Sequence, residues 1–137
     1  MSFKDSLTIK FNKNLKFLTS GSLKLSEQGN LHWTDFTSKP SRYIEEIFVE
    51  PKLTFEISKF EFGAGIRYFT RNSFAYVTAT EKKMTGKYKS FGPVSDVYYS
   101  PSGKLSIRFS GWYEFIYTES DTERNVSNFN FDVIWRI

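Results

Sequence analysis

The chain has no cysteine, a single histidine and no long apolar run, and each absence excludes a class of function. Without cysteine there is no disulfide framework, no thiol nucleophile and no thiolate metal site. No segment approaches the roughly 18 consecutive apolar residues that a transmembrane helix needs. The one histidine, His32, has no cysteine or regularly spaced carboxylates around it, so we expect no metal site there.

Motifs that organise catalysis are missing too. The sequence contains no phosphate-binding glycine loop, no GxSxG elbow and no HExxH pair. The acidic residues at 45–46 and in the segment ESDTE at 119–123 read as solvated surface, since the second group lacks the glycine at the sharp bend of a calcium loop. The opening residues MSFKDSLTIKF have no apolar core, so we expect no signal peptide within them. We therefore expect no enzymatic activity and no cofactor.

What the chain has in abundance is aromatic residues. Among 137 residues there are 15 Phe, 8 Tyr and 3 Trp, or 19% aromatic against 39% hydrophobic overall. Such large apolar residues favour strands with one apolar face. The net charge is +4, and its lysines gather in two runs, Lys10, Lys13, Lys16 and Lys24, and Lys82, Lys83, Lys87 and Lys89. We read these runs as solvated strand ends or loops and do not expect a nucleic-acid partner.

The C-terminal residues alternate strictly between apolar and polar side chains. One face of a strand there carries Phe129, Phe131, Val133, Trp135 and Ile137, and the other carries Asn128, Asn130, Asp132, Ile134 and Arg136. Successive side chains of a strand point to opposite faces, so this pattern predicts a strand with one apolar face. Its length matches the roughly 9–11 tilted residues with which a strand crosses a bilayer.

Similar alternation recurs along the whole chain, with turn signals every ten to fifteen residues or so and no helical stripe. We expect turns at 27–30, 70–73 and 101–104, a polar loop or extended hairpin at 81–89, and final strands at 104–118 and 126–137. The apolar phase flips near residues 58–59, which indicates either a tight turn or a β-bulge. The predicted fold is a single all-β domain over 1–137, an antiparallel up-and-down barrel of about eight to ten strands, with a β-sandwich as the alternative.

The final hairpin supplies the candidate site. Its polar face would bring together Arg108, Glu114, Asp132 and Arg136, with partners such as Glu56 or Arg67 from other strands. Its opposite face would carry Phe109, Phe115, Phe129, Phe131, Val133 and Trp135. In a membrane barrel the polar face lines the lumen and the aromatic face meets lipid, whereas in a soluble barrel the aromatic face is the core. Periodicity alone leaves both arrangements open.

The segment from about 94 to 137, with SGWYEF, IYTESDTERNV and SNFNFDVIWRI, resembles the last hairpin and closing strand of bacterial outer-membrane β-barrel proteins. Tyr and Trp near the strand ends add to the likeness. The resemblance implies an outer-membrane location, membrane lipid as partner and a structural, transport or adhesion role. It also implies that this domain is either a whole barrel or the C-terminal part of a larger one.

Two other functions fit the same pattern. A soluble calyx would hold a small apolar ligand or a glycan, with Trp33 and Trp112 as the candidate stacking residues. A self-assembling subunit would instead join copies edge to edge through its long terminal strand. The oligomeric state stays open at this point.

Overall fold

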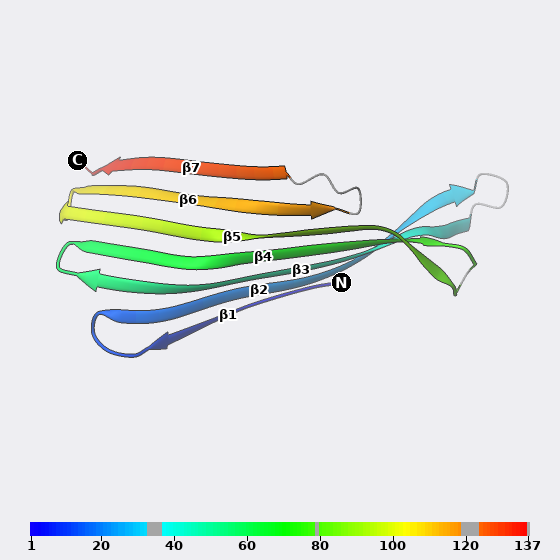
Figure 1. The fold of residues 1–137 in the computed structure, drawn as a ribbon, viewed down its shortest axis with the longest axis horizontal. Helices are drawn as coiled ribbons and strands as arrows, with labels where there is room; N and C mark the ends of the chain where they lie inside the picture. Colours follow the sequence, from blue (N-terminus) through cyan, green and yellow to red (C-terminus); the bar gives the residue numbers. More distant parts are fainter. Residues whose placement is uncertain (33–36, 79, 119–123, 137) are drawn as a thin grey trace.

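The computed structural model describes residues 1–32, 37–78, 80–118 and 124–136. They form one antiparallel sheet in which each strand pairs with the next along the chain (Figure 1). The strands are β1 (Ser2–Lys10), β2 (Leu15–His32), β3 (Thr37–Ile57), β4 (Phe60–Tyr76), β5 (Lys82–Ser102), β6 (Leu105–Thr118) and β7 (Arg124–Trp135). The expected all-β, antiparallel, up-and-down architecture is confirmed.

The described sheet has seven strands and is not closed, because β1 and β7 each pair on one side only. The count is below the expected figure of about eight to ten because turn-like segments stay inside long strands. Residues 27–30 remain in β2, with a register shift between Gln28 and Gly29. Residues 70–73 remain in β4, where Asn72 pairs with Glu45 of β3 and with Lys87 of β5. Pairing on both sides overrides the turn propensity of these residues.

The phase flip near residue 58 is a tight turn. β3 ends at Ile57 and β4 begins at Phe60, and Ser58 takes the positive φ of 55° that the reversal requires. The hairpin expected at 101–104 is also present, with β5 ending at Ser102 and β6 starting at Leu105. The two final strands therefore lie within a few residues of their expected bounds.

The two ends of the sheet differ in construction (Figure 1). At one end, the chain reverses in three short turns at residues 11–14, 58–59 and 103–104. At the other end, strands β2 to β5 continue past the last β1–β2 pair, Ser2 with Lys24, and past the last β5–β6 pair, Tyr88 with Thr118. We call this four-stranded continuation the arm; its described residues are 25–32, 37–45, 72–76 and 82–87.

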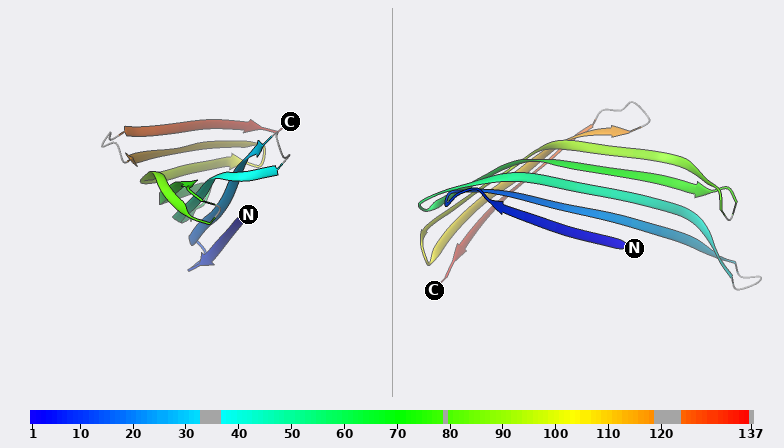
Figure 2. Two further views of the ribbon diagram at one scale, coloured as in Figure 1. Left: turned by 90° about the vertical axis from the view of Figure 1, so that its right-hand side faces the viewer. Right: turned by 90° about the horizontal axis from the view of Figure 1, so that it is seen from below.

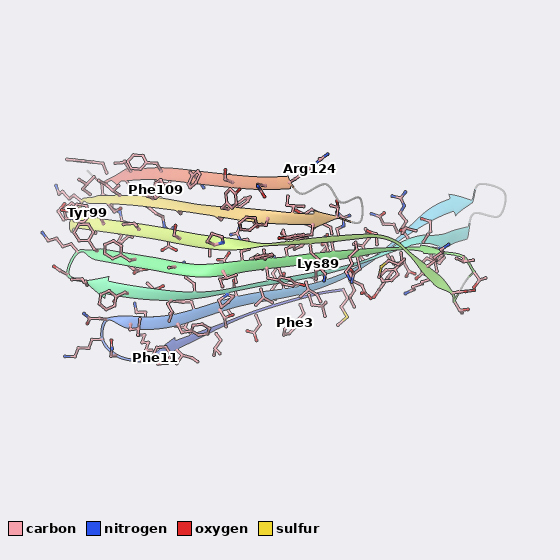
Figure 3. The ribbon with its side chains drawn as sticks, in the orientation of Figure 1. Phe3, Phe11, Lys89, Tyr99, Phe109 and Arg124 are labelled. Atoms are coloured by element: carbon pink, nitrogen blue, oxygen red, sulfur yellow. The ribbon has the colours of Figure 1, made fainter. Side chains whose placement is uncertain are left out.

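The sheet is bowed along its length (Figure 2), and its two faces differ in chemistry. Between the short turns and the arm, the registers place the odd-numbered residues of β1, β2, β3, β5, β6 and β7 on one face, together with the even-numbered residues of β4 from Phe60 to Tyr68. We call this the apolar face; Phe3, Tyr99 and Phe109, labelled in Figure 3, belong to it. The opposite surface, the polar face, carries most of the charged side chains.

Candidate functional site

Burial in this sheet follows the alternation of the strands, and the enclosed positions of β5 lie on the polar face. Along residues 89–96 of β5, exposed and buried residues alternate without interruption. The exposed set includes Phe91 and Pro93 on the apolar face, whereas the buried set includes Ser90, Val94 and Asp96 on the polar face. Ser90 is 1% exposed and Phe91 is 45% exposed. A polar side chain is thus enclosed where its apolar neighbour is open, which excludes the apolar face as the enclosed core of this sheet.

The apolar face extends over all seven strands. Every one of its six candidate residues on the last hairpin is exposed: Phe109, Phe115, Phe129, Phe131, Val133 and Trp135. Its rings stack on one another across strands, with centroid separations of 4.3 Å for Phe60 and Tyr99 and 5.7 Å for Phe91 and Tyr117. The ring of Phe129 also lies over Gly111 of β6, where an added Cβ would come within 2.5 Å of it. The result is a continuous aromatic and aliphatic surface far larger than the few hundred Å² usual on soluble monomers.

The polar face is organised around Arg67 of β4. Its Nε atom donates a 2.7 Å hydrogen bond to Glu50 Oε2 of β3, and its Nη1 atom lies 3.8 Å from Glu114 Oε1 of β6. Its guanidinium carbon also lies 5.7 Å from the ring centre of Phe48 and 5.1 Å from that of Trp112. All three ionised side chains are less than a quarter exposed, so each needs its partners to offset desolvation.

Two ion pairs on this face skip a strand, and in both cases a glycine lies between the partners. Lys52 Nζ of β3 lies 2.5 Å from Asp96 Oδ1 of β5, and Gly63 of β4 lies beneath them. A Cβ at Gly63 would come within 2.7 Å of the Asp96 carboxylate. The Arg67–Glu114 pair passes Gly92 of β5 in the same way, since Arg67 and Gly92 are register partners.

Further pairs join neighbouring strands toward the two ends of the sheet. Lys16 and Glu56 form an ion pair near the short turns. Glu46 lies 3.3 Å from Lys24 and 3.6 Å from Arg71 near the arm. Ion pairs therefore join strands β2 to β6 across the polar face.

Of the four polar residues predicted from the last hairpin, only Glu114 belongs to an ion pair among the described residues. Glu114 pairs with Arg67, which is one of the two partners expected from other strands; the other, Glu56, pairs with Lys16 instead. Arg108 and Asp132 are register partners on the polar face, but both are exposed and form no ion pair with each other. Arg136 follows the end of β7, where its backbone N–H donates to Lys104 O.

Several members of the network, among them Glu50, Lys52 and Asp96, were not among the predicted site residues. Each of these three occupies an even position on an alternating strand, so its face could have been inferred. Its partner could not, because the Lys52–Asp96 pair depends on the registers of two successive strand pairs. These residues also line a polar groove of about 290 Å³, together with Arg67, Arg108, Trp112, Asn128 and Asn130.

Of the two tryptophans proposed for ligand stacking, the structure describes only Trp112. Trp33 lies outside the described residues. Trp112 is half-buried on the polar face, and the Arg67 guanidinium lies over the face of its ring. Among the residues that the structure describes, no group of three or more His, Asp or Glu side chains is arranged to hold a metal ion. The same residues include no helix long and apolar enough to cross a membrane.

Comparison with known proteins adds no family: no protein-family model, curated protein or solved structure matches this chain.

Proposed function

We propose that this sheet is part of the wall of a bacterial outer-membrane β-barrel, with a structural, transport or adhesion role and no catalysis. The observation that carries the proposal is the reversed burial along the inner strand β5, with Asp96 7% exposed on the polar face and Phe91 45% exposed on the apolar one. A membrane barrel has this polarity, because its outer surface meets lipid and its lumen is polar. A soluble calyx needs the opposite polarity, with its aromatic face enclosed.

The dimensions of the apolar face support the same function. On β3 it runs from Ile47 to Ile57, and Ile47, Val49, Leu53, Phe55 and Ile57 are each between 39% and 49% exposed. Eleven residues rising about 3.3 Å each, in a strand tilted by about 45°, cover roughly 25 Å along the membrane normal. That height matches the apolar band of outer-membrane barrels, which is about 25 Å.

The unequal ends of the sheet give further support. Outer-membrane barrels have short turns on one side of the membrane and longer excursions on the other. Here the three short turns share one end, and the arm projects from the other (Figure 1). The arm carries charged side chains that suit it to water beyond the bilayer. Among them, Lys82 Nζ lies 3.5 Å from the ring centre of Tyr43, and Glu27 accepts a hydrogen bond from Tyr76.

Refolding into lipid tests this function. The protein should remain aggregated or unfolded in plain buffer and should fold into detergent micelles or phosphatidylcholine vesicles with a β-type circular dichroism spectrum. Folded and boiled samples should then migrate differently in a denaturing gel. A monodisperse, folded monomer in buffer without detergent would contradict the proposal, because no soluble monomer could leave this apolar face open.

A second candidate, assembly through strand edges, is favoured by one specific observation. Within the described sheet, β1 and β7 each leave one row of backbone donors and acceptors unpaired, and every residue of both strands is exposed. Such edges pair readily with further strands. Sedimentation of the lipid- or detergent-folded protein distinguishes the two: a single concentration-independent monomer discards assembly between copies.

A further inference from the structure

The short-turn end of the sheet carries a row of basic side chains. Each of the three short turns contributes one lysine, Lys13, Lys59 or Lys104, and Arg136 follows the end of β7 beside them. We call these four residues the basic rim. All four are exposed, and none forms an ion pair within the described part of the chain.

The backbone fixes the rim in place. Each turn accepts a backbone hydrogen bond from the neighbouring part of the sheet. Glu56 N–H of β3 donates to Asn14 O at 2.7 Å, and Ser100 N–H of β5 donates to Lys59 O at 2.9 Å. Arg136 N–H, directly after β7, donates to Lys104 O at 2.8 Å. The rim is thus a single ordered edge and not three independent loops. The four basic residues therefore lie in one row along this end of the sheet.

Each part of the rim adjoins exposed apolar surface. Lys13 lies two residues after Phe11, Lys59 directly precedes Phe60, and Arg136 directly follows Trp135. Lys104 precedes Leu105, whose register partner is Trp135. The exposed fractions of the three aromatic side chains are 61%, 42% and 68%. A long basic side chain beside an apolar band places its stem on hydrocarbon and its charge in the headgroup layer.

The neighbouring acidic side chains do not pair with the rim residues. Glu56, the nearest acidic side chain to the first turn, is paired with Lys16 on the polar face. Glu61, its register partner on β4, also belongs to the polar face and not to the turns. The rim therefore places three lysines and one arginine, none paired with an acidic side chain of the described residues, at the border of the apolar face, where basic groups attract a layer of negative phosphates.

We propose that the basic rim binds the anionic phospholipid headgroups of the leaflet that the short turns enter, and so favours one orientation of the sheet in the membrane. This inference rests on the proposed function. A lipid leaflet fits the observations better than a soluble polyanion, because the charges form one row that follows the edge of the apolar face. A free polyanion would not require contact with that face.

The test compares two variants that lose the same charge. In the rim variant, Lys13, Lys59 and Lys104 become Gln; in the control, Lys82, Lys83 and Lys87 of the arm become Gln. Each variant and the unchanged protein are mixed with vesicles of phosphatidylcholine alone or of phosphatidylcholine with phosphatidylglycerol, and membrane-bound protein is separated by flotation at low and at high salt. Protease treatment of the inserted protein reports its orientation.

The unchanged protein should bind the anionic vesicles more tightly at low salt, and the rim variant should lose about a hundredfold of that binding, since each of three lost basic residues near an anionic surface strengthens binding about fivefold. The control should keep most of it. Equal binding of the unchanged protein to both vesicles, or equal losses in the two variants, overturns the inference while leaving the membrane function standing. Full binding to polyphosphate in solution, abolished in the rim variant, also overturns the lipid assignment. Failure to insert into either vesicle contradicts the proposed function itself.

Discussion

Arg67 and Glu114 form an ion pair across an intervening strand, with Nη1 and Oε1 3.8 Å apart and Gly92 of β5 beneath them. The same guanidinium donates to Glu50 on the other side at 2.7 Å. One arginine thereby links β3, β4 and β6 on the polar face. Its neighbours Phe48 and Trp112 limit access of water to it. This cluster is the best-defined interior feature of the sheet.

Arg67→Met should destabilise the folded protein by about 1–3 kcal/mol, because Glu50 and Glu114 lose their partner in a partly enclosed site. Urea unfolding of the vesicle-folded protein measures this. Lys24→Gln is the matched control; its lysine is 56% exposed, so the change should cost less than about 1 kcal/mol. Restoring stability by adding Glu50→Gln and Glu114→Gln to Arg67→Met would identify unpaired charge as the cause. No recovery in the triple variant would show that packing of the arginine dominates.

Gly92→Ala should be among the most damaging small substitutions. A Cβ at this position would lie 1.7 Å from the backbone oxygen of Tyr113, so β5 and β6 would have to separate. We expect a loss of about 3 kcal/mol or more in unfolding free energy. Gly86→Ala, in the same strand, meets nothing within 4 Å and should change stability by less than about 0.5 kcal/mol. Similar effects of the two changes would mean that the close approach at Gly92 is absent.

Phe131→Arg tests the direction of the apolar face. Phe131 pairs with Phe109 and is 66% exposed, so in a membrane barrel the charge would enter lipid. Lipid-facing arginine at mid-bilayer depth costs about 2–4 kcal/mol, whereas at the adjacent polar-face position Asn130→Arg should cost much less. Folding equilibria in vesicles provide the comparison. Equal tolerance of arginine at both positions would argue against a lipid-facing Phe131.

One tyrosine of the arm, Tyr76, should lose its phenolic proton at a higher pH than an ordinary tyrosine. A hydrogen bond to the Glu27 carboxylate raises the pKa of Tyr76 from 10 to about 12. The phenol therefore loses its proton later in the folded than in the unfolded chain. The stabilising effect of the bond is present below pH 10 and is lost as the pH rises toward 12. Ultraviolet titration of the folded protein, compared with Tyr76→Phe and Glu27→Gln, should assign the late component to Tyr76; its persistence in both variants would refute the assignment.

Much of the fold could be read from alternation alone. The pattern at residues 128–136 assigned the two faces of β7 correctly, and the phase flip marked the turn at Ser58. Strand continuity was harder to infer. Asn72 favours turns locally, but it is held in β4 by pairing with strands on both sides, a tertiary effect that no local window contains.

The polar network was predictable in kind but not in detail. Which charged side chains meet depends on the register of each strand pair. A shift of one residue would move every side chain of a strand to the opposite face. Thus Glu114 could be expected to meet a charge such as Arg67, but the Lys52–Asp96 pair required knowing that Gly63 lies between them. Which face is enclosed could not be derived, because alternation is identical for a lipid-facing and a core-facing strand.

The central claim, that the apolar face meets lipid, is best tested by labelling single cysteines along β7. The natural chain has no cysteine, so each substitution creates a unique site. Positions 128 to 133 would each carry an environment-sensitive fluorophore in vesicle-folded protein. We predict a period of two: labels at 129, 131 and 133 are quenched by brominated lipid, and labels at 128, 130 and 132 by aqueous iodide. Quenching by iodide at all six positions, or the opposite alternation, would contradict a membrane-spanning sheet.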